Sequence, residues 1–208
     1  MGQGFFNFGV DPKAGEWKHE ILWRLFYGLI AVFISTEPIC YIIRNIGPPV
    51  GEVLVCSMAG LFFSLPEGAI RNNVRMGFFA ALSCSLAAAF GLSATYYFES
   101  TNDFLKGIVI VLACLGGTLG LCAGIGSRSF LASILGFLAG QYTGFVAGQY
   151  YGWLLSHLDS NELFFLVLQV LLAFYLPIGI SIGLAVWLGV KLSKRPSASR
   201  GTAEEVGP

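Results

Sequence analysis

The chain has 208 residues, of which 55% are hydrophobic and 12% are charged, and its mean hydropathy is +0.72. Soluble domains carry about 25% charged residues, so this composition excludes an ordinary soluble domain and points to lipid as the main solvent. Twelve basic and twelve acidic side chains cancel, which argues against a charged tail that binds nucleic acid. The five cysteines lie in or beside apolar runs without paired spacing, which excludes a disulfide scaffold.

The apolar stretches predict an all-α bundle of six membrane-spanning helices, because one span needs about 20 mostly apolar residues. The predicted spans lie near residues 21–43, 52–70, 76–98, 107–126, 130–156 and 163–190. Around this transmembrane domain, residues 21–190, we expect a cytoplasmic or interfacial segment over residues 1–20 and a basic, mobile cytoplasmic tail over residues 191–208.

The distribution of basic residues predicts the orientation. With six spans, both termini share one side with the loops that contain Arg71 and Arg128, and ten of the twelve Lys and Arg residues fall on that side. Only Arg44 and Lys106 fall on the other side. Because cytoplasmic loops carry an excess of basic residues, we expect a multi-pass protein of the cell (inner) membrane with both termini in the cytoplasm. The basic face is suited to anionic lipid or to an acidic cytoplasmic partner.

The first predicted span contains a carboxylate at membrane depth, Glu37, followed by Pro38. A charge inside a span is costly, so it is a candidate functional group, and the proline bends the helix beside it. The hydroxyls of Ser35 and Thr36 are placed to satisfy backbone groups at the bend. One interpretation is an ion or proton site; the other is a structural acid that pairs with Arg44 or is capped near the interface.

The second predicted span ends with Glu67 after Pro66, four residues before Arg71. This spacing is typical of an ordinary helical ion pair. The alternative interpretation is a cytoplasmic gate or vestibule.

The fourth and fifth predicted spans carry glycines every four residues. The two ladders are Gly116, Gly120 and Gly124, and Gly136, Gly140, Gly144, Gly148 and Gly152. Such a ladder forms a smooth ridge that another helix backbone can approach closely, which drives helix association in lipid. The ladders therefore predict either packing within the chain or an oligomer interface.

The hairpin of spans two and three resembles the hairpin of spans four and five. The segment 77–80 matches 136–139 at an offset of 59, and Arg71 matches Arg128 at an offset of 57. Both hairpins enter from the same side, so the resemblance predicts a possible parallel duplication rather than an inverted repeat.

Neutral polar residues and a proline mark the last two spans. Gln141 and Gln149 lie in the fifth span, where they can line a pathway or make interhelical hydrogen bonds. Pro177 is placed to interrupt the sixth helix, and broken helices often mark transport sites.

The sequence contains none of the motifs for metal, haem, phosphate or nucleophilic chemistry, and it has only two histidines. We therefore expect no enzyme, no cofactor and no metal site. The first hypothesis is a small-solute or ion channel or carrier that works as an oligomer. The alternative is a non-catalytic subunit that anchors, assembles or senses within a larger membrane complex.

Overall fold

A computed structural model describes residues 16–47, 49–98, 104–157 and 163–194 of the chain. The elements in chain order are a π-helix η1 (His19–Trp23) and the α-helices α1 (Arg24–Asn45), α2 (Val50–Ser64), α3 (Pro66–Ile70), α4 (Val74–Phe98), α5 (Phe104–Gly126), α6 (Phe130–His157) and α7 (Leu163–Ser193). The described part contains no strand, and six helical stretches are long and apolar enough to cross a membrane. The predicted all-α bundle of six spans is confirmed.

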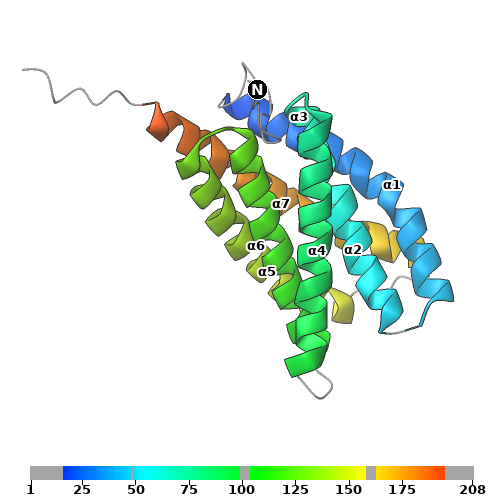
Figure 1. Cartoon of the computed structure of the whole chain (residues 1–208). Coiled ribbons are helices and arrows are strands. Elements are labelled where there is room, and N and C mark those ends of the chain that lie inside the picture. Colours follow the sequence, from blue (N-terminus) through cyan, green and yellow to red (C-terminus); the bar gives the residue numbers. More distant parts are fainter. Residues whose placement is uncertain (1–15, 48, 99–103, 158–162, 195–208) are drawn as a thin grey trace, which may run out of the picture.

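Each span packs against the next one along the chain and the last packs against the first, so the helices form a closed ring. Figure 1 shows these helices from the side. In chain order, α1 packs on α2, α2 on α4, α4 on α5, α5 on α6 and α6 on α7, and α7 packs on α1. The most extensive contact joins α5 to α6. A ring of this kind surrounds a central volume that six helices share.

The two ends of the ring differ in what they contain. We call the end with η1, the α3–α4 turn, the α5–α6 turn and the end of α7 the terminal face, and the opposite end the loop face. The predicted segments 1–20 and 191–208 fall largely outside the described residues, although the chain is already helical at Trp17 and α7 continues to Ser193.

Large apolar side chains cover the outside of the ring. Phe130 is 82% exposed, and Val74 and Phe90 are each 75% exposed. Soluble monomers rarely expose apolar surface on this scale, because water disfavours it. The outer surface is therefore suited to lipid, in agreement with a multi-pass membrane protein.

Three prolines lie inside the spans, and one of them coincides with a break. Pro38 and Pro177 lie within the continuous helices α1 and α7, so the expected interruption at Pro177 is absent. The hydroxyls of Ser35 and Thr36 donate to the carbonyl of Val32 before Pro38, as expected for backbone groups near a proline. Pro66 is the first residue of α3, and it separates the short helix from α2.

The glycine ladders of α5 and α6 face each other within the chain. A Cβ atom at Gly116 or Gly120 would overlap the backbone of Gly140 or Gly136, and one at Gly144 would overlap the carbonyl of Leu112. The two backbones are in direct contact along this seam, so only glycine fits there. An oligomer interface through these ladders stays a prediction. The surroundings of Gly152 lie outside the described residues.

The hairpin α2–α3–α4 repeats the geometry of the hairpin α5–α6 at an offset of 56 residues. In each hairpin, glycines of the first arm touch backbone atoms at equivalent positions of the second arm. The equivalent contacts are Gly60 with Cys84 and Gly116 with Gly140, and Gly68 with Gly77 and Gly124 with Ser133. This structural register differs from the offsets of 57 and 59 that the sequence suggests.

The turns of the two hairpins match in the same register. Asn72 and Arg128 are the described non-glycine residues with positive φ, at 48° and 55°. The next residues, Asn73 and Ser129, both accept a hydrogen bond of 3.2 Å from the backbone N–H three residues later. Each turn therefore has a left-handed residue followed by a helix N-cap, which supports the predicted parallel repeat.

Candidate functional site

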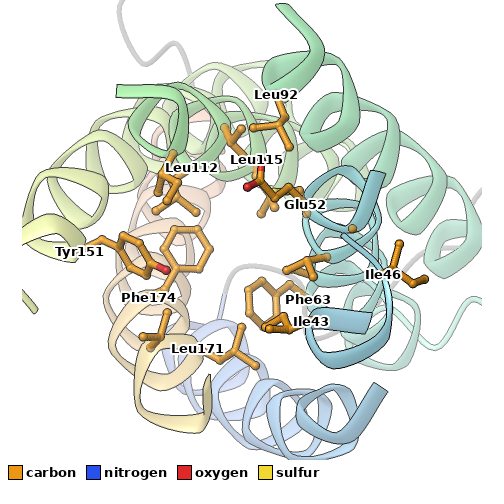
Figure 2. Close-up of a pocket in the computed structure, with 17 residues that line it drawn as sticks. Ile43, Ile46, Glu52, Phe63, Leu92, Leu112, Leu115, Tyr151, Leu171 and Phe174 are labelled. Atoms are coloured by element: carbon orange, nitrogen blue, oxygen red, sulfur yellow. The ribbon is translucent and has the colours of Figure 1, made fainter. Parts of the chain in front are cut away.

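A cavity of about 390 Å³ lies between the helices in the half of the ring nearest the loop face (Figure 2). Its walls are almost entirely apolar. The lining residues are Ile43, Ile46, Gly51, Glu52, Val55, Cys56, Ala59, Phe63, Leu92, Ile108, Val111, Leu112, Leu115, Tyr151, Val170, Leu171 and Phe174. The cavity reaches the last turn of α1 and the first turn of α2, and its volume falls within the range of small-molecule sites.

Aromatic side chains close the inner end of this cavity. The ring of Phe63 lies 5.7 Å from that of Phe174 and 5.1 Å from that of Tyr175. The Tyr175 ring occupies the space that a side chain at Gly28 would need, and its hydroxyl donates a 3.0 Å hydrogen bond to the carbonyl of Arg24. This aromatic layer joins α2, α7 and α1 across the centre of the ring.

About one helical turn further toward the terminal face lies a buried ion cluster of Glu20, Arg24, Glu67 and Arg71. These side chains are no more than 5% exposed. Arg24 makes a bidentate pair with Glu67, with N–H···O distances of 2.8 and 3.0 Å, and a 3.2 Å contact with Glu20. Arg71 makes a second bidentate pair with Glu20, at 2.6 and 2.8 Å.

The ion cluster connects four elements of the ring. Glu20 lies in η1, Arg24 begins α1, Glu67 lies in α3, and Arg71 also donates to the carbonyl of Ala123 in α5. Two positive and two negative charges balance. Since an unpaired buried charge is very costly, these helices are held together at this end as long as all four members remain in place.

Of the residues singled out from the sequence, Glu67 and Arg71 belong to this cluster. Their hydrogen bonds join separate elements, because Glu67 binds Arg24 and Arg71 binds Glu20. The gate interpretation of Glu67 stays a prediction.

The other predicted pathway residues lie away from the cavity. Glu37, Gln141, Gln149 and Pro177 are exposed on the outside of the ring, and Pro38 is partly exposed. They are absent from the cavity lining. The structure therefore separates them from both the cavity and the ion cluster.

Sequence reasoning missed three acidic or basic residues of this region: Glu20, Arg24 and Glu52. Glu20 and Arg24 lie on either side of the predicted start of the first span, near residue 21, and Glu52 is the first residue of the span predicted near 52–70. A signal was present, since Glu20 and Arg24 have the same spacing as Glu67 and Arg71 and lie on the same predicted side. Two such pairs on different helices can exchange partners. In the structure Glu67 binds Arg24 and Glu20 binds Arg71, while Arg24 also keeps a contact with Glu20.

Within the described residues, no group of three or more His, Cys, Asp or Glu side chains is placed to hold a metal ion. No family model, no curated protein and no solved structure matches this chain. The structure is that of a multi-pass membrane protein with a largely apolar cavity between its helices.

Proposed function

We propose that this protein is a carrier that moves a small amphipathic solute through the centre of a single chain. The observation that supports the proposal is the order of layers along the ring axis. An apolar cavity near the loop face is followed by the aromatic layer of Phe63, Phe174 and Tyr175, and then by the buried ion cluster. A site that reaches one face and is closed toward the other is what a carrier needs before it changes conformation.

The chemistry of the walls favours an amphipathic solute over a hydrated ion. Ion pathways expose carbonyls or rings of charged groups that replace water around the ion. Among the described lining residues of this cavity Glu52 is the one that carries a charge, and aliphatic and aromatic side chains form most of the surface. Such a surface gains free energy by covering apolar parts of a ligand.

The ion cluster is suited to act as the inner gate. It holds η1, α1, α3 and α5 together through charge-assisted hydrogen bonds, which are shorter and stronger than neutral ones. Opening toward the terminal face requires these pairs to separate or exchange partners. An Arg–carboxylate cluster with two bidentate pairs has discrete alternative pairings, as a two-state element requires.

We further propose that the loop face lies outside the cell and both termini lie in the cytoplasm. The terminal face carries the exposed Lys18, Arg75, Arg128, Lys191 and Lys194, in keeping with the basic side of membrane proteins. This surface is available for anionic lipid or an acidic cytoplasmic partner. Because each chain encloses its own cavity, an oligomer would contain one pathway per copy.

An efflux assay tests the proposed function. Purified protein is reconstituted into vesicles loaded with a mixture of small amphipathic solutes that are cationic, neutral or anionic, and the solutes released are identified by mass spectrometry. We expect at least one class to leave faster than from protein-free vesicles and from vesicles with Ala59→Phe, which fills the cavity. Release of no class above these controls would contradict a carrier and favour the non-transporting subunit.

A further inference from the structure

We propose that the cavity selects lipophilic organic cations, such as aryl or alkyl ammonium compounds, and that Glu52 is the residue that recognises their charge. The assignment rests on the proposed carrier function and names its substrate class. It depends on the position of one carboxylate in an otherwise apolar site.

Glu52 lies in the first turn of α2 and is one of the residues that line the cavity, and Figure 2 shows its side chain pointing into it. Its Oε2 atom is buried and has no hydrogen-bond partner among the described residues. Burial without a partner is unfavourable for a carboxylate oxygen, since the lost hydration is not replaced. A bound cation or N–H donor would replace it.

The remaining lining residues suit the rest of such a ligand. The rings of Phe63, Phe174 and Tyr151 face the same cavity, and aromatic faces attract organic cations. Leu112, Leu115 and Leu171 provide aliphatic surface for the apolar part of the ligand. The site therefore combines one negative charge, aromatic rings and an apolar wall.

The same composition disfavours other ligands. The described lining residues include no Lys, Arg or His, so among them an anion would meet Glu52 without a compensating charge. A divalent metal ion prefers six or more oxygen ligands, whereas the lining side chains that the structure describes offer oxygens from Glu52 and Tyr151 alone. A neutral apolar solute would leave the Glu52 carboxylate unpaired.

A binding experiment with a matched pair of probes tests this assignment. Phenyltrimethylammonium and its uncharged carbon analogue tert-butylbenzene have nearly the same shape and differ in charge. Ligand-observed NMR with the purified full-length protein measures their binding. We expect the cation to bind the wild type more tightly, and Glu52→Gln to weaken its binding by about tenfold or more, equivalent to about 1.4 kcal/mol.

Two variants serve as comparisons. Glu37→Gln removes one acid from the exposed surface of α1 and is expected to leave cation binding unchanged. Glu52→Asp keeps the charge and is expected to retain part of the binding. Each variant is first checked for a single symmetrical peak in size-exclusion chromatography.

Equal binding of the cation to the wild type and to Glu52→Gln, or tighter binding of the neutral analogue by the wild type, would overturn the assignment. Efflux of neutral solutes that is unaffected by Glu52→Gln would overturn it as well and leave the carrier function standing. Binding of the cation through Glu52 without efflux of any solute would support the site and contradict the carrier.

Discussion

The two hairpins of this protein share one backbone plan and use it differently. At an offset of 56 residues their glycine contacts, left-handed turn residues and helix caps coincide. In the hairpin α5–α6 seven glycines between Gly116 and Gly148 lie where a Cβ atom would overlap the backbone of the other helix, and the contact between the two helices is the most extensive in the ring. In the hairpin α2–α3–α4 larger residues replace several of these glycines, and Pro66 breaks the first arm.

The two hairpins therefore contribute differently to packing and to the site. Positions that correspond to glycine in one hairpin include Ser64 and Ala80 in the other, so α2 and α4 pack less closely than α5 and α6. The α2–α3 arm also supplies Glu52, Cys56, Ala59 and Phe63 to the cavity and Glu67 to the ion cluster. The hairpin α5–α6 is thus the more closely packed of the two, and the hairpin α2–α3–α4 contributes Glu52, Glu67 and Arg71.

The largest effect is expected when the close contact between α5 and α6 is disrupted. In Gly120→Leu the new side chain overlaps the backbone of Gly136, and no side-chain rotation relieves a clash with backbone. We expect a loss of more than about 4 kcal/mol and no folded protein in fluorescence-detected size-exclusion chromatography. The control is Gly47→Leu, where a Cβ atom meets nothing within 4 Å. A folded, stable Gly120→Leu protein would show that the seam is not tight.

The next largest effect is expected at the ion cluster. Arg71→Met leaves the buried Glu20 without two of its charged hydrogen bonds, at a cost of about 3–5 kcal/mol. Arg75→Met changes an exposed arginine in the first turn of α4 and is expected to cost less than about 0.5 kcal/mol. Thermal unfolding in detergent measures both. Similar losses in the two variants would show that the cluster does not hold the terminal face together.

A double-mutant cycle tests whether Glu20 and Arg71 are energetically coupled. Because Glu20→Gln removes the negative charge that Arg71 neutralises, the double variant Glu20→Gln/Arg71→Met is expected to be more stable than the sum of the single losses predicts. Strict additivity of the two losses would mean that the pair is not energetically coupled.

The smallest effect is expected at the two helix caps. Asn73→Ala removes the side-chain acceptor at the start of α4 and is expected to lower the free energy of unfolding by about 1 kcal/mol. Asn73→Asp keeps an acceptor and is expected to leave the free energy of unfolding unchanged. Ser129→Ala is expected to cost more, since the Ser129 hydroxyl also lies 3.0 Å from the Ser193 hydroxyl. Equal losses at both caps, measured by thermal unfolding, would argue against a role for the Ser193 contact.

The sequence was sufficient to predict the architecture because lipid imposes simple rules on it. Span length and hydropathy identified six helices, and the four-residue spacing of glycine identified the helices with the closest backbones. Both signals are local. The register of the hairpin repeat was harder to predict from the sequence. Backbone contacts define this register, and the side chains at equivalent positions differ, as at Cys84 and Gly140.

The candidate site was harder to predict because it depends on contacts between distant parts of the chain. Arg24 and Glu67 are 43 residues apart, and Glu20 and Arg71 are 51 residues apart. The position of Glu37 within a predicted span favoured it as a functional residue, yet its side chain lies on the outer surface of the ring. Glu52 lies close to the predicted end of a span, where hydropathy does not distinguish a loop from a cavity wall.

The proposed carrier requires a cavity that opens to the loop face and is closed toward the terminal face by the ion cluster. The most direct test uses a chain in which Cys56, in the cavity wall, is the only cysteine. A membrane-impermeant methanethiosulfonate reagent is applied separately to each face of oriented vesicles, and the rate of labelling is measured. We expect faster labelling from the loop face, slower labelling there with phenyltrimethylammonium, and faster labelling from the terminal face in Glu67→Gln. Equal rates from both faces, or no labelling from either, would contradict it.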